Sequence, residues 1–167
     1  MNDTKITFIG PGAMAEAIFA GLIKNEISAP SNITVSGPNV ERTQALAAKY
    51  GVLPYNNNRD AVANAQIVLL SIKPQRLNAV MAELRGHLPE GCLVISIIAG
   101  ATLKKLSHGL NHNAVVRTMP NTPSKIGEGI TVWASTHTVT DTQQDMARKV
   151  LSAVSYTHLT LPTILLV

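Results

Sequence analysis

The sequence contains few aromatic residues, few charged residues and a single cysteine. Of its 167 residues, 4% are aromatic and 14% are charged, whereas 46% are hydrophobic, so the expected core is aliphatic. That hydrophobic share excludes intrinsic disorder, which combines few apolar residues with high net charge. Cys92 has no second cysteine with which to form an internal disulfide, and the absence of disulfides is typical of proteins in a reducing cytoplasm. Its place beside Leu93 and Val94 predicts a buried thiol.

Long apolar runs, targeting signals and metal-binding motifs are also missing. No apolar run approaches the ~20 residues needed to cross a bilayer. Residues 1–4 lack the charged and apolar regions of a secretory signal, so we expect a cytoplasmic protein that does not bind membranes. The histidines and the cysteine show neither His-x-His nor Cys-x-x-Cys spacing, so no metal site is expected.

The charge is mildly positive and dispersed. Fourteen Lys and Arg residues stand against ten Asp and Glu residues, which gives a net charge of +4. The basic residues do not cluster with aromatic ones, as they commonly do in nucleic-acid-binding surfaces. The pattern favours a phosphate-bearing small molecule over nucleic acid as the partner.

Apolar, β-rich segments alternate along the chain with helical patterns. Strands are predicted at residues 5–9, 33–36, 67–72, 93–98, 114–117 and 131–134. Helices are predicted at residues 13–24, 40–50, 75–84, 103–110 and 140–153. The almost wholly apolar run at 67–72 is typical of a strand buried on both faces of a parallel sheet. The alternation predicts a Rossmann-like, doubly wound α/β fold with right-handed crossovers.

A glycine-rich turn lies between the first predicted strand and the first predicted helix. Residues 10–15 read Gly-Pro-Gly-Ala-Met-Ala and fit the dinucleotide fingerprint G-x-G-x-x-G/A. Gly10 permits the tight turn, Gly12 lets a pyrophosphate approach the backbone, and Ala15 allows close packing of helix and strand. The helix N-terminus then offers N–H groups to the phosphates. Alone, the Gly-Pro-Gly triplet would be a plain turn, but in this context it predicts nucleotide binding.

The end of the second predicted strand bears on which nucleotide binds. NAD sites commonly place Asp or Glu there to bind the ribose 2′-hydroxyl. Here residues 36–39 carry no carboxylate, and Arg42 follows closely. Ser36, Asn39 and Arg42 therefore favour NADPH, with NADH still possible. The alternative is that Ser36 or Asn39 serves as a helix N-cap.

Three further predicted strands end in unusual residues, and ligands of open α/β sheets bind at the carboxyl ends of strands. Lys73, in the segment 71–74, either faces the phosphates or is a solvated residue before a helix. The small residues of segment 97–100 either admit the nicotinamide ring or form an ordinary turn. Asn121 and Thr122 follow the fifth strand and either donate hydrogen bonds into the cleft or belong to a rigid surface turn.

The last thirteen residues depart from the pattern. Residues 155–167 contain no Asp, Glu, Lys or Arg and end in a bare apolar string. One interpretation is a last strand docked on the sheet. We favour the other, that the segment is foreign, because residues 155–163 resemble translated adaptor sequence. The expected organisation is a domain at 1–154 followed by a tail at 155–167 that is not native.

Taken together, the motifs resemble the N-terminal domain of the pyrroline-5-carboxylate reductase family. The resemblance covers about residues 6–154. The matching segments are 8–15, 36–38, Asn58, 71–75, 99–100, 117–123 and 127–129. The glycine-rich turn is shared by many dehydrogenases, whereas the Lys-Pro-Gln step and the Met-Pro-Asn-Thr-Pro loop are far more specific.

The resemblance implies an oxidoreductase of proline biosynthesis. NADPH would reduce the C=N bond of 1-pyrroline-5-carboxylate to give L-proline. Cofactor contacts are implied for Ile9, Gly10, Pro11, Gly12, Ala13, Met14, Ser36, Asn58, Ser71, Ile72, Lys73, Pro74, Ile97, Ile98 and Ala99. Asn121 and Thr122 would lie near the nicotinamide. No catalytic residue is assigned, because the family's substrate loop has no counterpart here.

The sequence also departs from this family. Family members continue into a helical C-terminal domain that forms the homo-oligomer and carries the substrate loop. We therefore expect this chain to be the cofactor-binding part and to be inactive alone. Two alternatives stay open. One is another NADP-dependent Rossmann dehydrogenase, of 3-hydroxy acid or F420-dependent type, against which the Met-Pro-Asn-Thr-Pro loop argues. The other is a non-catalytic NADP-binding module.

Overall fold

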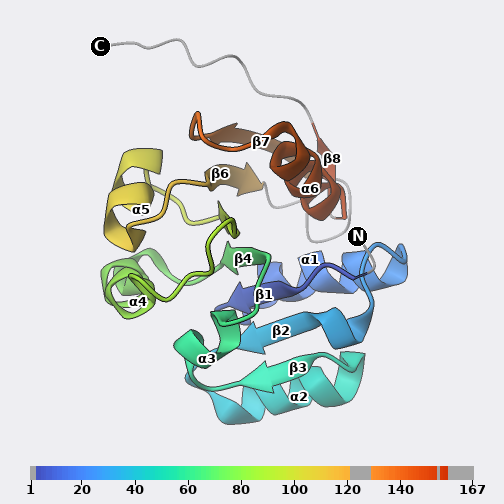
Figure 1. The fold of residues 1–167 in the computed structure, drawn as a ribbon. Coiled ribbons are helices and arrows are strands. Elements are labelled where there is room, and N and C mark those ends of the chain that lie inside the picture. Colours follow the sequence, from blue (N-terminus) through green and yellow to red (C-terminus); the bar gives the residue numbers. More distant parts are fainter. Residues whose placement is uncertain (1–2, 121–128, 154, 158–167) are drawn as a thin grey trace.

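One eight-stranded sheet runs through the molecule, with helices on both faces (Figure 1). The structure is a computed structural model, and it describes residues 3–120, 129–153 and 155–157. The strands are β1 (Ile6–Ile9), β2 (Ile33–Ser36), β3 (Leu53–Tyr55), β4 (Ile67–Leu70), β5 (Leu93–Ser96), β6 (Val115–Pro120), β7 (Gly129–Ser135) and β8 (Ser155–Thr157). The helices are α1 (Ala13–Lys24), α2 (Val40–Tyr50), α3 (Asn58–Val62), α4 (Leu77–Leu84), α5 (Leu103–Leu110) and α6 (Asp141–Ser152), with short 3₁₀ turns η1 (Pro30–Asn32) and η2 (Pro74–Arg76).

The sheet order is β3-β2-β1-β4-β5-β6-β7-β8. Its pairs are parallel except for β6 with β7, which is antiparallel. The chain leaves β1 toward β2 on one side and returns to add β4 on the other, so the winding direction reverses between β1 and β4. This confirms the predicted doubly wound, Rossmann-like fold and places its topological switch point at the ends of β1 and β4.

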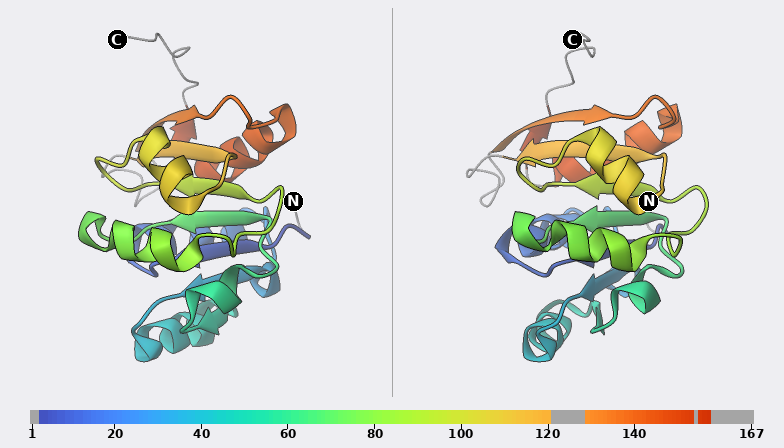
Figure 2. Two further views of the ribbon diagram at one scale, coloured as in Figure 1. Left: turned by 60° about the vertical axis from the view of Figure 1, so that its left-hand side comes forward. Right: turned by 90° about the vertical axis from the view of Figure 1, so that its left-hand side faces the viewer.

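Helices cover both faces of the sheet (Figure 2), and two clusters of apolar side chains hold them there. One includes Phe8 and Phe19 and joins α1, α2 and α6 to one face, and the other joins α3, α4 and α5 to the opposite face. Strand β4 contributes to both, because Leu69 belongs to the first cluster and Val68 to the second. This confirms the prediction that β4 is buried on both faces.

Some element boundaries differ from the sequence-based ones. Strand β4 ends at Leu70 rather than at residue 72, and its last hydrogen bond to β1 is the one that the backbone N–H of Ser71 donates to the carbonyl of Ile9 at 2.9 Å. The helix predicted from residue 75 starts as the 3₁₀ turn η2 and becomes α-helical only at Leu77. Strands β6 and β7 run to Pro120 and from Gly129, longer than predicted, because they pair with each other.

Two elements were not predicted. Strand β3 is three residues long and exposed throughout, and it contains Pro54. A proline and an absent apolar alternation both argue against a strand, but β3 lies at the sheet edge, where proline is tolerated. Helix α3 has five residues, and the Asn57 side chain caps it by accepting hydrogen bonds from the N–H groups of Arg59 and Asp60.

The C-terminal segment is described only in part. Residues 155–157 form β8, which pairs with β7 in parallel. For these residues the structure agrees with the docked-strand interpretation, and the foreign origin of residues 155–167 stays a prediction. Residues 158–167 lie outside the described part of the chain. Within the described ranges, no helix has the length and apolarity required to traverse a bilayer.

Candidate functional site

A cleft of about 420 Å³ opens at the carboxyl ends of β1, β2 and β4, at the topological switch point. It is lined by Ile9, Gly10, Pro11, Gly12, Ser36, Gly37, Pro38, Asn39, Arg42, Asn56, Asn58, Ser71, Ile72, Lys73, Arg76, Ala79, Val80 and Glu83. In open α/β sheets this is the position at which ligands bind.

The glycine-rich turn forms the floor of the cleft. Gly10 has a φ of +92°, and a Cβ atom there would lie 2.7 Å from Cγ2 of Ile72 and 2.9 Å from the carbonyl oxygen of Ser71. No other residue therefore fits this position without a shift of backbone. Gly12 is the N-cap of α1, and a Cβ atom added there would meet nothing within 4 Å. The backbone at the start of α1 thus borders open space, as binding of a phosphate group at this helix N-terminus requires.

Neighbouring strand ends hold this turn in place. Ser71 donates from Oγ to the carbonyl oxygens of Gly10 at 2.6 Å and of Ile9 at 3.1 Å. Gly37, after β2, lies so close to the ring of Pro11 that a Cβ atom would approach Cδ at 2.6 Å. Ser71 therefore braces the turn from β4, and Gly37 does so from β2.

A chain of hydrogen bonds crosses the wall of the cleft beyond β2. Ser36 is fully buried, and its hydroxyl donates to Oδ1 of Asn58 at 2.8 Å. Nδ2 of Asn58 donates in turn to Oε2 of Glu83, on α4, at 2.9 Å. Asn39 caps α2 by accepting from the N–H of Arg42, which confirms the N-cap interpretation for Asn39.

Three cations and one carboxylate belong to the described lining: Arg42, Lys73, Arg76 and Glu83. A surplus of positive charge around open space favours an anionic ligand.

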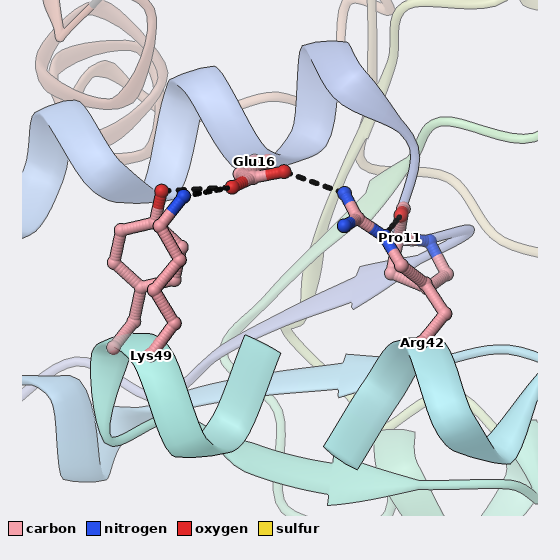
Figure 3. Close-up of polar contacts among 5 residues, drawn as sticks. Pro11, Glu16, Arg42 and Lys49 are labelled. Carbon is pink, nitrogen blue, oxygen red and sulfur yellow. Dashed lines mark hydrogen bonds and ion pairs between the residues drawn. The ribbon is translucent and has the colours of Figure 1, made fainter. Parts of the chain in front are cut away.

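The guanidinium of Arg42 is held by a carboxylate outside the cleft (Figure 3). Its Nε donates to the carbonyl oxygen of Pro11 at 3.3 Å, and its Nη2 pairs with Oε2 of Glu16 on α1. The other oxygen of Glu16 accepts from Nζ of Lys49 at 3.0 Å and from the hydroxyl of Tyr50 at 2.8 Å. Hydrogen bonds from Lys49, Tyr50 and Arg42 outweigh desolvation and lower the pKa of Glu16 from 4.5 to about 2. Glu16 is therefore ionised and fixes one edge of Arg42.

The structure gathers nine of the predicted cofactor-binding residues around this cleft: Ile9, Gly10, Pro11, Gly12, Ser36, Asn58, Ser71, Ile72 and Lys73. It does not place six others on the cleft wall: Ala13, Met14, Pro74, Ile97, Ile98 and Ala99. The side chain of Ile98 is only 3% exposed and packs in the core beneath α4 and α5. Met14 packs beside the opposite core cluster. Asn121 and Thr122 lie outside the described residues.

Sequence reasoning missed the wall formed by α4 and the turn before it. Arg76, Ala79, Val80 and Glu83 line the cleft from this side. Ala79, Val80 and Glu83 follow Arg76 by three, four and seven residues, a spacing that indicates one shared face of a helix. Nothing in the sequence indicated that this face turns toward the glycine-rich turn. Within the described ranges, no group of three or more potential metal ligands is present.

Known proteins share both the sequence and the fold. A pyrroline-5-carboxylate reductase of Synechocystis sp. is 39% identical over 150 residues, which are 90% of this chain and 56% of the relative. The corresponding reductase of Pasteurella multocida is 37% identical over 162 residues, 94% of this chain and 58% of the relative. The chain thus spans little more than half the length of these curated relatives.

Solved structures give the same result. The pyrroline-5-carboxylate reductase of Coxiella burnetii superposes with a TM-score of 0.91 at 34% identity, over 96% of this chain and 60% of that one. The Plasmodium falciparum pyrroline carboxylate reductase with NADP bound superposes with a TM-score of 0.84 at 25% identity, over 96% and 59%. Prephenate dehydrogenase from A. aeolicus, at 13% identity and a TM-score of 0.78, shares the fold.

A family model described as "NADP oxidoreductase coenzyme F420-dependent" matches residues 5–100. These residues contain β1 to β5 and the whole described lining of the cleft. Because this match covers more than half of the chain, the protein belongs to that family of NADP oxidoreductase domains, within which it is similar to pyrroline-5-carboxylate reductases.

Proposed function

We propose that this chain binds NADP(H) and is the cofactor-binding part of a pyrroline-5-carboxylate reductase. The observation that carries the proposal is the open space beside Gly12 at the start of α1, bordered by the cations of the cleft. A dinucleotide needs both features, because its pyrophosphate requires a helix N-terminus without a side chain in the way and its charge requires positive partners.

The residues of the cleft fit such a nucleotide. The backbone at Gly12 and the N-terminus of α1 would hold the pyrophosphate, and Arg42 would bind the adenosine 2′-phosphate near the end of β2. Lys73 adds positive charge on the β4 side. When bound, the dinucleotide supplies the hydride that reduces a C=N bond. The chain itself orients the nucleotide and balances its charge.

The substrate assignment rests on the relatives. Similarity to pyrroline-5-carboxylate reductases extends over 150 residues, well beyond residue 100, where the broader family match ends. This extent favours reduction of 1-pyrroline-5-carboxylate to L-proline over an F420-dependent or 3-hydroxy acid reaction. Because the chain spans about 56% of those relatives, we propose that the substrate-binding half and the homo-oligomer interface lie in the remaining part.

Nucleotide binding is tested by fluorescence titration of the purified chain with NADPH and NADH. A matched variant is Gly12→Asp, which retains a good N-cap for α1 and places a carboxylate in the space that phosphates would enter. We expect saturable binding by the wild type and at least about a tenfold loss in the variant, the equivalent of 1.4 kcal/mol. The melting temperature should change little. Absence of binding by a wild type that melts cooperatively would contradict the proposal.

The reaction is tested in a hybrid in which residues 1–154 are joined to the C-terminal part of the Synechocystis reductase. We expect consumption of NADPH that depends on 1-pyrroline-5-carboxylate and none with the chain alone. Turnover of a 3-hydroxy acid or of reduced F420 instead would establish the alternative dehydrogenase. Nucleotide binding by a folded hybrid without any turnover would favour a non-catalytic module.

A further inference from the structure

The chain of hydrogen bonds from Ser36 through Asn58 to Glu83 has a fixed direction. A carboxylate only accepts hydrogen bonds, so Asn58 must turn its amide nitrogen toward Glu83. The amide oxygen of Asn58 then faces Ser36, and this oxygen also only accepts. The Ser36 hydroxyl must therefore donate to Asn58, and its one proton is used inside the protein.

This direction matters at the end of β2, because a dinucleotide's adenosine ribose lies there in this fold. A 2′-phosphate has only acceptor oxygens when ionised and binds best to N–H and O–H donors. Ser36, which the sequence suggested as such a donor, has no proton to offer while Glu83 holds Asn58 in this orientation. The structure leaves Arg42 as the charged donor on the β2 side of the cleft.

The negative charge of Glu83 also disfavours a 2′-phosphate in the cleft. Its carboxylate belongs to the lining of the cleft and lies two hydrogen bonds from the Ser36 hydroxyl. A 2′-phosphate bound beside Ser36 would be repelled by this carboxylate, and salt screens such a repulsion fully only beyond a Debye length of about 8 Å. A ribose 2′-hydroxyl carries no charge and is not repelled.

We propose that Glu83 is a specificity-determining positioning residue that limits the preference of this site for NADPH over NADH. It acts through Asn58 by consuming the Ser36 proton, and directly by its charge. In a typical NAD site the acidic residue stands at the end of β2, whereas here helix α4 supplies it from the opposite wall. The inference rests on the proposed nucleotide site.

The variant Glu83→Gln tests the hydrogen-bond direction. A glutamine can donate to the oxygen of Asn58, which allows the Asn58 amide to turn over and donate to Ser36. Ser36 lines the cleft although the residue is fully buried, so its freed hydroxyl can donate to a phosphate only where that phosphate is seated directly against the end of β2. We expect the ratio of affinities for 2′,5′-ADP and 5′-AMP to rise about fivefold or more, the value of one hydrogen bond of about 1 kcal/mol. NADPH and NADH should show the same change.

Two further variants separate this mechanism from simpler ones. Glu90→Gln removes the same charge at an exposed position that does not line the cleft, and it should leave the ratio unchanged. Ser36→Ala should have little effect on the ratio in the wild type but should remove most of the gain in Glu83→Gln. This coupling is measured by titration calorimetry of the four proteins of the cycle, with thermal melts as a control for folding.

The outcomes are distinct. An unchanged ratio in Glu83→Gln, or an equal gain in Glu90→Gln, would overturn the role of Glu83. A gain that persists in full when Ser36 is also alanine would overturn the hydrogen-bond mechanism. If neither nucleotide fragment nor dinucleotide binds to the folded wild type, the proposed function itself falls, and this inference with it.

Discussion

Protonation of Glu16 should destabilise the fold at low pH. Its side chain is 19% exposed and accepts hydrogen bonds from Lys49, Tyr50 and Arg42, which join α2 to α1. These contacts lower its pKa from 4.5 to about 2. A carboxylate with a lowered folded-state pKa contributes stability that is fully present above its unfolded pKa and is lost as the pH falls through the folded value. The relevant window is therefore from about pH 4.5 down to about pH 2.

The size of the effect follows from the shift and from solvent exposure. A shift from 4.5 to about 2 would be worth about 3 kcal/mol without screening. The side chains of Lys49 and Arg42 are 62% and 40% exposed, and ion pairs so exposed are strongly screened. We therefore expect Glu16→Gln to lower the free energy of unfolding by about 1–2 kcal/mol at pH 7, a difference that shrinks as the pH falls through the window.

Urea denaturation of the wild type and of Glu16→Gln, repeated from pH 7 to pH 3, measures this difference. The control is Asp145→Asn, which breaks the exposed pair of Asp145 and Arg148 on α6 and should cost less than about 0.5 kcal/mol at every pH. A difference between wild type and Glu16→Gln that stays constant over this range, or grows toward low pH, would refute the reasoning.

Three further predictions concern packing and reactivity. Gly21→Ala should destabilise the fold by about 1–3 kcal/mol in urea denaturation, because the new Cβ atom would lie 2.3 Å from the carbonyl oxygen of Ala153; unchanged stability would contradict the close approach of α1 to the end of α6. Phe19→Leu should cost about 1–2 kcal/mol, since it removes an edge-to-face contact with Tyr50 at 5.2 Å between ring centroids, and a Tyr50→Leu background should reduce that cost. Cys92 is 1% exposed, and burial raises the pKa of its thiol to about 12. Iodoacetamide should therefore label this thiol slowly in native buffer and rapidly in urea. Equal labelling rates in the two conditions would contradict its burial.

The sequence predicted the parts of the fold that depend on local patterns. Helices α1, α2 and α5 begin and end where their apolar spacing and stop residues place them, and Gly51 ends α2 in the left-handed conformation expected of a helix-stop glycine. Strand β3 escaped prediction because three exposed residues carry no periodicity. Its existence depends on pairing with β2, which is a tertiary contact.

The same division applies to the site. The tight turn at Gly10 and the open backbone at Gly12 follow from a contiguous motif, so sequence and structure agree on this geometry. The partners of Ser36 do not follow from any motif, because Asn58 is 22 residues away and Glu83 is a further 25. A serine at the end of β2 suggests a phosphate donor until its actual hydrogen-bond acceptor is known.

The strand order has a consequence for synthesis of the chain on the ribosome. The sheet grows from β1 by adding β2 and β3 on one side, and each later strand from β4 to β8 joins the opposite edge in the order in which it is made. No strand has to be inserted between two that already pair. The described walls of the cleft come from residues 9–83, so they have all been synthesised before the first residue of β5. The walls of the cleft are thus complete early in translation, and the later strands extend the sheet at the edge away from β3.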